Sequence, residues 1–333
     1  MLPYRLAFWI PCKERSNLAD VSIFEPIQQE IVQVEERLNQ VINAAPPEMS
    51  EQLDHVLRGG KLFRPALTLL AGKLYHGNPD LLIPVAAAVE VLHTATLIHD
   101  DVLDNSHFRR GKPTINSLWG NYDAVLLGDY LFAASAHMTA ETENVRAMKL
   151  HAQALMTVCS GEIKEFLNPF NQSREHYFQR IGDKTASLFS AAAEFGVILS
   201  NAPEEAVQSL KEYGYNLGMS FQIVDDILDL TGQKETMGKP VASDLSQGVL
   251  TLPTILLLEY PEGRDIKEIF ERDKEKGIKL IKERVYEPGI IEECYLIARS
   301  YCSQARLALE QLPPSPISSL LASLTDEVIK RAK

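Results

Sequence analysis

The sequence predicts an all-α protein, a single-domain helical bundle around a central cavity. Apolar residues recur at three- and four-residue spacing from Val21 onward, which is the period of a helix with one buried face. Strand patterns are nearly absent, and an apolar content of 45% with only 8% aromatic residues is typical of a mainly helical globular protein. We see no internal boundary in the 333 residues. The prediction is one domain over residues 21–333, after an extension of unknown role, residues 1–20.

The periodic segments predict individual helices, and proline and glycine separate them. The helices fall over residues 23–42, 62–75, 81–103, 122–139 and 207–230. The last three are apolar almost all round, which places them in the middle of the bundle. Residues 261–333 alternate charged and apolar residues without a chemical motif, and we expect peripheral helices there.

Charge and composition exclude several classes of protein. A net charge of -12 argues against a nucleic-acid binder, since no domain-wide basic surface can neutralise a phosphate backbone. The four cysteines show no metal-binding spacing, and so few thiols suggest a reducing compartment. No uninterrupted apolar run approaches the ~18 residues of a membrane span, and we find no convincing signal peptide. These patterns predict a cytoplasmic protein without a transmembrane segment.

Two aspartate clusters of identical spacing are the clearest indication of a functional site in the sequence. Residues 100–104 read DDVLD and residues 225–229 read DDILD, each at the C-terminal end of an apolar helix. On a helix, positions i, i+1 and i+4 share one side, so each trio forms one carboxylate patch. The first aspartate cluster is Asp100, Asp101 and Asp104; the second is Asp225, Asp226 and Asp229.

Carboxylates in apolar surroundings, at the negative ends of helix dipoles, require cations. Ligands that are all oxygen favour a hard ion, and Mg²⁺ binds through a few carboxylates while sharing its other positions with water and substrate phosphates. A single DDxxD sequence is more often a solvated helix end. Two copies flanked by Leu, Ile and Val predict a magnesium site for a phosphate ester.

Basic residues lie before, between and after these clusters in the sequence. Lys61 and Arg64 lie at a helix start after two glycines, and Arg109 and Arg110 come a few residues beyond the first cluster. Guanidinium groups suit two-pronged phosphate binding. The other candidates are Lys184, Thr185, Gln222, Lys239 and, two helical turns before Asp100, His93.

His99 beside Asp100 raises a rival, a metal-dependent phosphohydrolase of the HD type. That class needs further histidine ligands, and it leaves the second aspartate cluster unexplained.

These motifs, in this order, resemble the trans-isoprenyl diphosphate synthases of the polyprenyl synthetase family, from Val21 to the C-terminus. The resemblance rests on Gly59-Gly60-Lys61 to Pro65, the first cluster with Arg109-Arg110, Lys184-Thr185-Ala186, Gln222 before the second cluster, Gly238-Lys239-Pro240 and Asp244-Leu245. It implies a homodimer, with the two clusters facing each other across the mouth of the cavity, and three Mg²⁺ ions per active site.

The resemblance also implies a role for each candidate. Asp100, Asp104 and Asp225 would be the main Mg²⁺ ligands, with Asp101, Asp226 and Asp229 binding bridging water or helping to hold the ions. Catalysis would depend on Asp100, Asp101, Asp104 and Asp225 with Arg109, Lys184 and Lys239. The allylic diphosphate would be held by Arg109, Lys184, Thr185, Gln222 and Lys239. Isopentenyl diphosphate would be held by Lys61, Arg64, His93 and Arg110.

The reaction implied is ionisation of the allylic diphosphate, condensation with isopentenyl diphosphate and loss of a proton. Residues 231–248 are the candidate for a closing loop. A class I terpene cyclase shares the ionisation step but uses no isopentenyl diphosphate, and a catalytically silent partner subunit would not need both clusters intact.

Product length depends on side chains about one turn before Asp100, which are Ala95 and Thr96. Short-chain family members typically have an aromatic residue near this point. Small residues here predict a product longer than the twenty-carbon geranylgeranyl chain, with peripheral membrane contact possible for its release. A short-chain farnesyl or geranylgeranyl synthase is the alternative, and Ala95 could simply allow close helix packing.

Overall fold

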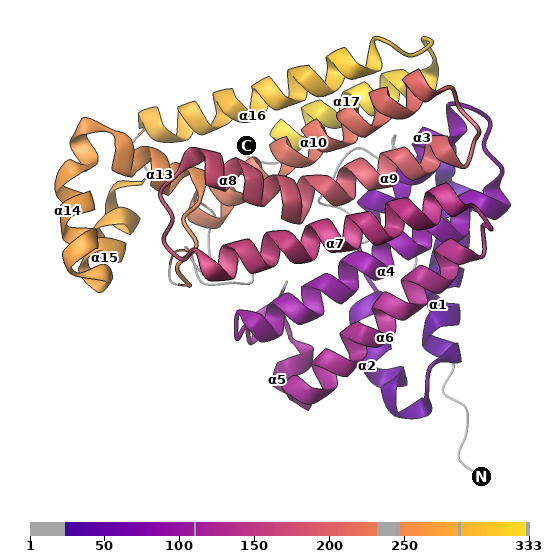
Figure 1. The fold of residues 1–333 in the computed structure, drawn as a ribbon, viewed down its shortest axis with the longest axis horizontal. Coiled ribbons are helices and arrows are strands. Elements are labelled where there is room, and N and C mark those ends of the chain that lie inside the picture. The colour runs from indigo at the N-terminus through magenta and orange to yellow at the C-terminus, as the bar shows by residue number, and fades with distance from the viewer. Residues whose placement is uncertain (1–23, 110, 232–244, 246, 286–287, 331–333) are drawn as a thin grey trace.

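The computed structural model describes residues 24–109, 111–231, 245, 247–285 and 288–330. The extension over residues 1–20 and most of the proposed closing loop lie outside these residues. The described chain consists of helices and one antiparallel pair of two-residue strands, β1 (Phe108–Arg109) and β2 (Lys112–Pro113). The all-α prediction is confirmed, and Figure 1 shows the helices side by side in one bundle.

The N-terminal half supplies the helices around the first aspartate cluster. A short 3-10 turn, Glu25–Ile27, leads into α1. The bounds are α1 Gln28–Ala44, α2 Ser50–Leu57, α3 Phe63–Lys73, α4 Pro79–Leu103, α5 Ile115–Trp119, α6 Asn121–Ala140 and α7 Val145–Leu167. Where the sequence predicts helices over 62–75, 81–103 and 122–139, α3, α4 and α6 differ from those limits by at most two residues. The periodic pattern therefore located these helices well.

Helix α4 is the buried centre of this half. Asn78 caps its start, because the side chain accepts a hydrogen bond from the backbone N–H of Asp80, and Pro79 has the φ of a first helical residue. Residues 85–89 are fully buried. By length and composition α4 could cross a membrane, but 72% of its apolar 18-residue window is buried inside the protein, as in the core helix of a bundle.

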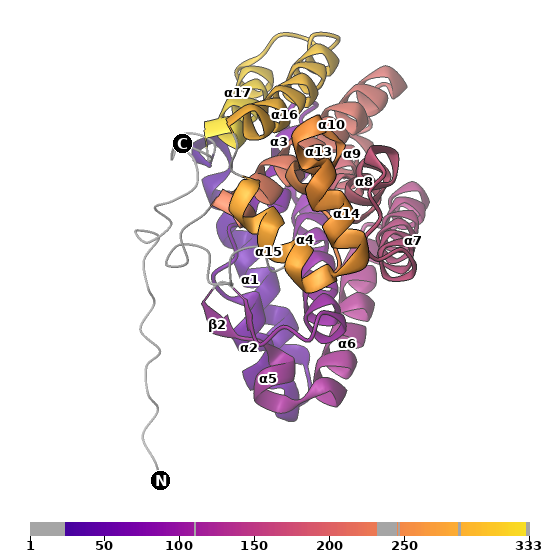
Figure 2. The same ribbon diagram turned by 90° about the vertical axis from the view of Figure 1, so that its left-hand side faces the viewer.

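The C-terminal half packs around a second long helix, α10. The bounds are α8 Arg174–Ile181, α9 Ser187–Ile198, α10 Glu204–Thr231, α13 Leu252–Glu259, α14 Arg264–Arg272, α15 Lys274–Arg284, α16 Pro288–Leu309 and α17 Pro316–Lys330. Helices α16 and α17 lie along α10 in both views (Figures 1 and 2). The side chains of Cys294, Ala298 and Ala305 on α16 are fully buried. The expectation of only peripheral helices after residue 261 is therefore wrong for α16, which completes the core.

Helices α8 and α9 are joined without a break by the π-helical segment Gly182–Ala186. Segments of this kind insert one extra residue into a turn and occur frequently at functional sites. Two of the candidate residues, Lys184 and Thr185, lie inside it.

Candidate active site

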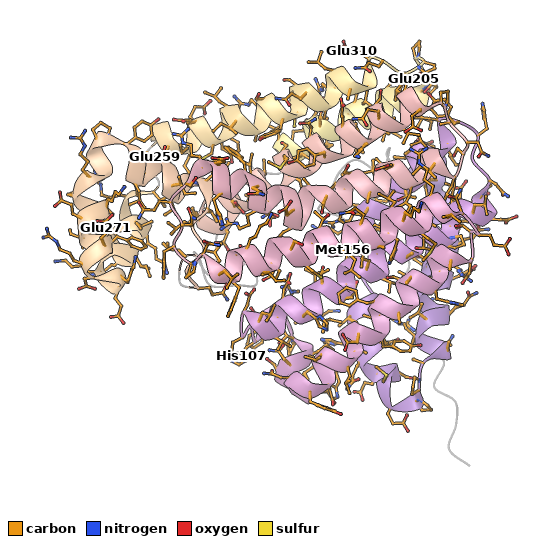
Figure 3. All side chains as sticks on the ribbon, in the orientation of Figure 1. His107, Met156, Glu205, Glu259, Glu271 and Glu310 are labelled. Carbon is orange, nitrogen blue, oxygen red and sulfur yellow. The ribbon has the colours of Figure 1, made fainter. Side chains whose placement is uncertain are left out.

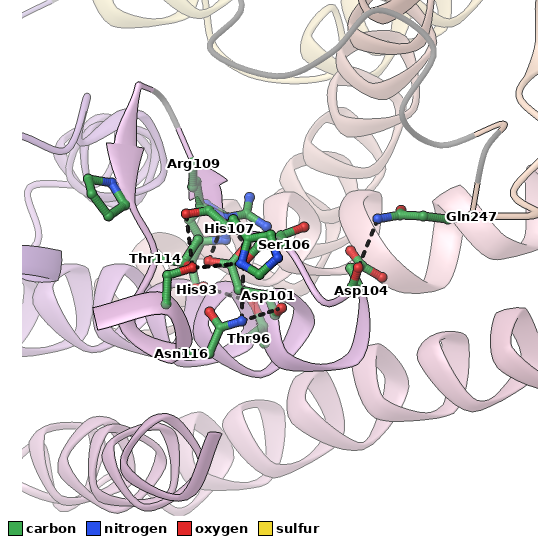
Figure 4. Close-up of polar contacts among 12 residues, drawn as sticks. His93, Thr96, Asp101, Asp104, Ser106, His107, Arg109, Thr114, Asn116 and Gln247 are labelled. Carbon is green, nitrogen blue, oxygen red and sulfur yellow. Dashed lines mark hydrogen bonds and ion pairs between the residues drawn. The ribbon is translucent and has the colours of Figure 1, made fainter. Parts of the chain in front are cut away.

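The first aspartate cluster occupies the last turn of α4. The carboxylate of Asp101 is buried, with 5% of the residue exposed, whereas Asp100 and Asp104 are half-buried. The Nε–H of Arg109 on β1 donates to both oxygens of Asp101, at 2.9 and 3.0 Å (Figure 4). The Asn116 side chain donates to the backbone carbonyl of Asp101 at 3.2 Å. The strand pair thus folds back on the end of α4.

A cavity of about 230 Å³ lies between the α2–α3 connection, α4 and the strand pair. Its lining includes Gly59, Gly60, His93, Asp101 and Arg109. The structure therefore brings the glycine turn to the same space as a predicted basic residue, a predicted histidine and the first cluster.

Lys61 and Arg64 are not among the residues lining this cavity. Lys61 is exposed just before α3. Arg64 is half-buried in the first turn of α3, with its guanidinium carbon 4.4 Å from the ring centre of Phe189. This stacking fixes the direction of the arginine side chain.

The second aspartate cluster lies near the end of α10, and its middle member is again buried and held by partners. Gln222 donates from Nε2 to Oδ1 of Asp226 at 2.8 Å, and the Tyr177 hydroxyl donates to Oδ2 at 2.7 Å. Thr185 in turn donates to Oε1 of Gln222 at 2.7 Å. Asp225 and Asp229 are half-buried. Two predicted diphosphate contacts, Thr185 and Gln222, therefore lie directly beside the second cluster.

Burial and the Asp226 carboxylate raise the pKa of Tyr177 well above its ordinary value. The phenol therefore stays protonated at neutral pH and acts as a donor to the carboxylate.

Lys184 lies between two glutamates of α7 that the sequence analysis did not select. Its Nζ is 2.6 Å from Oε2 of Glu162 and 2.5 Å from Oε1 of Glu165. Burial lowers the pKa of Lys184, but Glu165 and Glu162 outweigh that effect and raise it above its ordinary value. Glu165 also pairs with buried Arg180, at 3.2 Å from Nε. The only sequence signal for these glutamates is their i, i+3 spacing after Gly161.

The two clusters are connected through the Lys184 acid–base group, which consists of Lys184, Glu162 and Glu165. Burial is the main cause that raises the pKa of Asp100 to about 7, and the charge of Glu162 adds to it. Lys184 and Arg109 act in the opposite direction, and Asp104 raises the pKa further. Asp100, Glu162 and Lys184 therefore influence one another directly, one residue away from the Thr185 contact to the second cluster.

The donor set fits a hard divalent cation. The half-buried members of both clusters offer carboxylate oxygens only. Burial and the charges of Glu162 and Asp104 raise the pKa of Asp100, so a cation beside it would stabilise its charged form. Within the described residues, no group of three His, Cys, Asp or Glu side chains converges as a ready-made metal cage. Mg²⁺ does not require one, because water and substrate phosphates supply much of its coordination.

Two predicted site residues, and most of the proposed closing loop, fall outside the part of the chain that the structure describes. Arg110 and Lys239 lie outside the described residues, as do residues 232–244 and 246 of the proposed closing loop. Just beyond them, Gln247 donates from Nε2 to the backbone carbonyl of Asp104 at 3.1 Å (Figure 4). The chain that follows the second cluster thus returns to the first.

His99 does not support the HD-phosphohydrolase alternative. Its Nε2 lies 3.1 Å from the carbonyl oxygen of Val125, and its ring packs edge-on against Phe132, with the centroids 5.2 Å apart. Both partners belong to α6, so the histidine is a packing residue between α4 and α6.

Comparisons with known proteins show the family of this chain. The Polyprenyl synthetase family model matches residues 46–287. Component 2 of the heptaprenyl diphosphate synthase of Geobacillus stearothermophilus is 35% identical, over 93% of this chain and 98% of its own length.

Two solved structures have the same fold. A polyprenyl synthase from Caulobacter crescentus CB15, complexed with calcium and isoprenyl diphosphate, has a TM-score of 0.88 and 30% identity, covering 95% of this chain and 99% of its own. A decaprenyl diphosphate synthase from Rhodobacter capsulatus has a TM-score of 0.84 and 35% identity, covering 94% and 99%. The chain described here therefore belongs to the polyprenyl synthetase family and is a prenyltransferase.

Proposed function

We propose that this enzyme condenses isopentenyl diphosphate with an allylic diphosphate to give an all-trans polyprenyl diphosphate longer than the geranylgeranyl chain. The observation that carries the proposal is the pair of aspartate clusters on either side of the Lys184 acid–base group. Each cluster has one buried, held carboxylate and two half-buried ones. This arrangement suits a diphosphate bound between cations on both sides.

The half-buried aspartates of the clusters, Asp100, Asp104, Asp225 and Asp229, would hold Mg²⁺, with Asp101 and Asp226 supporting them. When bound, the metal neutralises charge on the departing pyrophosphate. The calcium and isoprenyl diphosphate bound to the Caulobacter relative are of the chemical classes that this donor set would accept. We propose that the ion is Mg²⁺ and that each active site would hold three of them.

Two basic residues of the chain would bind the allylic diphosphate during the reaction. Lys184 and Arg109 present positive charge to the allylic diphosphate while their glutamate and aspartate partners fix their positions. The allylic C–O bond breaks, pyrophosphate leaves, and the double bond of isopentenyl diphosphate attacks the allylic cation. The new C–C bond forms and leaves a cation on the isopentenyl unit. This unit loses a proton from its C2 to the released pyrophosphate, and the electrons of that C–H bond form the new double bond. The product is again an allylic diphosphate, so the cycle can repeat.

Isopentenyl diphosphate would occupy the cavity beside α4. The cavity is lined by His93 and by the glycine turn that precedes Lys61, and it reaches the first cluster and the allylic diphosphate through Asp101 and Arg109. This location places the second substrate next to the first, as the condensation requires.

Two features favour a long product. The named relatives include heptaprenyl and decaprenyl diphosphate synthases. In addition, α4 contains no Phe, Tyr or Trp between Pro79 and Leu103, so this helix offers none of these bulky side chains below the first cluster.

The direct test is incorporation of labelled isopentenyl diphosphate by the purified chain alone, with each allylic primer in turn and extraction of the products. A terpene cyclase would consume the allylic diphosphate without incorporating label. Because one relative is component 2 of a heptaprenyl diphosphate synthase, the assay also tests whether this chain needs another subunit.

We also propose that the enzyme is a homodimer. Large apolar side chains are exposed along the outer sides of α6 and α7, namely Tyr122, Val125, Leu126, Met156 and Ile163. Figure 3 shows Met156 on the outward side of α7. A surface of this kind is typical of a protein–protein contact.

A further inference from the structure

The buried carboxylate of each cluster is held in a similar way, but by different residues. In the first cluster one arginine, Arg109, contacts both oxygens of Asp101. In the second, Gln222 donates a hydrogen bond to Oδ1 of Asp226 and Tyr177 donates one to Oδ2. Tyr177 belongs to α8, so its hydroxyl connects the second cluster directly to a different helix.

Tyr177 and Thr185 approach the second cluster from the same helical run, although they are eight residues apart. In a regular α-helix eight residues turn by about 800°, which leaves the two side chains about 80° apart. The π-helical segment Gly182–Ala186 adds one residue to a turn, so eight residues turn by roughly 700° and the side chains differ by only about 20°. The irregular turn thus aligns both hydroxyls toward α10.

Glycines on the neighbouring helices accommodate the wider turn. A Cβ on Gly161 of α7 would lie 2.8 Å from the Cβ of Asp183, and one on Gly218 of α10 would lie 2.6 Å from the Cα of Ala186. Any larger residue at either position would push the π-helical segment away. The local packing therefore preserves the alignment of Tyr177 and Thr185.

We propose that Tyr177 is a positioning residue of the second metal site. Together with Gln222, its hydroxyl fixes the Asp226 carboxylate and thereby the orientation of the turn that presents Asp225 and Asp229. This inference rests on the proposed function, because it assumes that the second cluster binds a divalent cation with a diphosphate. Outer partners of metal-binding carboxylates typically change metal affinity by ten- to hundredfold when removed.

The test is Tyr177→Phe in the full-length protein, with binding of Mn²⁺ measured by electron paramagnetic resonance at saturating inorganic pyrophosphate. We expect Mn²⁺ binding to weaken by roughly ten- to hundredfold. Tyr213→Phe is the matched control, because Tyr213 is equally buried and donates to the carbonyl of Leu321 at 2.7 Å, a contact between α10 and α17. It should lower the melting temperature without changing Mn²⁺ binding.

A double variant shows whether the effect passes through the carboxylate. In an Asp226→Asn background, Tyr177→Phe should cause little further loss of Mn²⁺ binding, since coupled residues are not additive. Unchanged binding in Tyr177→Phe, an equal loss in Tyr213→Phe, or a full additional loss in the Asp226→Asn background would each overturn the proposal. Mn²⁺ binding is measured without turnover, so a wild-type chain that binds Mn²⁺ but incorporates no isopentenyl diphosphate would overturn only the proposed function.

Discussion

Arg109 reaches both carboxylate oxygens of Asp101 through a single N–H group, at 2.9 and 3.0 Å. The pair is largely buried, so each side chain fixes the position of the other. A lysine at position 109 has no planar guanidinium to maintain this contact.

Arg109→Lys should therefore weaken use of the allylic diphosphate, with a loss of about 1.5–3 kcal/mol, or roughly ten- to hundredfold in kcat/KM. Arg110→Lys is the natural comparison, because the resemblance assigns Arg110 to isopentenyl diphosphate. Steady-state kinetics with each substrate varied in turn would separate the two. The division of roles is wrong if both variants impair the same substrate equally.

Asp100→Ala and Asp225→Ala should each lose most of the activity and retain the helical fold. Both side chains are half-buried at helix ends, so neither truncation opens a cavity in the core. Labelled isopentenyl diphosphate incorporation across a Mg²⁺ series, with circular dichroism for the fold, measures the effect. Asp265→Ala on α14, where the side chain is mostly exposed, is the control and should behave as wild type. Near-normal turnover by either cluster variant would exclude the metal assignment.

The stability of the metal-free enzyme should depend on pH through Asp100. Its pKa is raised from 3.8 to about 7 in the folded protein, chiefly by burial and by the charge of Glu162. The folded state therefore binds this proton more tightly than the unfolded state, so the contribution is full below about pH 4 and is lost as the pH rises to about 7.

Denaturant titrations with a chelator, over this pH range, would compare wild type with Asp100→Asn. The wild type should lose more unfolding free energy than the variant as the pH rises. Identical pH profiles for the two proteins would show that Asp100 does not titrate in this way.

The sequence predicted the features that depend only on residues close together in the chain. Helix positions followed from apolar spacing, and the DDxxD pattern placed three carboxylates on one side of each helix end. Partners from distant segments were not predictable: Glu162 and Glu165 meet Lys184, and Tyr177 meets Asp226, only because α7, α8 and α10 pack together. The π-helical segment was also not predictable from the sequence, since no single residue type specifies an inserted residue in a helix.

The proposed dimer predicts that a charge on the exposed face of α6 and α7 separates the subunits. Leu126→Asp combined with Met156→Asp should convert a dimer to a monomer in analytical ultracentrifugation, because burying unpaired carboxylates is costly. Leu307→Asp on α16 provides the control, since Leu307 is similarly exposed on another surface. A monomeric wild type, or a double variant that still dimerises, would contradict the assignment of this interface.

The two residues that the sequence selects for control of product length, Ala95 and Thr96, lie in different surroundings on α4. Ala95 is five residues before Asp100, about 140° around α4, and is fully buried. Thr96 is four residues before, only about 40° from Asp100, and is half-buried, with its hydroxyl donating to the carbonyl of His93. Thr96 therefore lies closer to the path of a chain that grows from the metal site.

Thr96→Phe should shorten the product while preserving the first condensations, because the ring would narrow the space below the cluster without touching the aspartates. Ala95→Phe must instead enter packed core and should cost about 1–3 kcal/mol of unfolding free energy. Chromatography of the extracted products, beside denaturant unfolding of both variants, distinguishes the two effects. A wild-type enzyme that stops at farnesyl or geranylgeranyl diphosphate would refute the long-chain proposal, and an unchanged product from Thr96→Phe would remove Thr96 from the path of the growing chain.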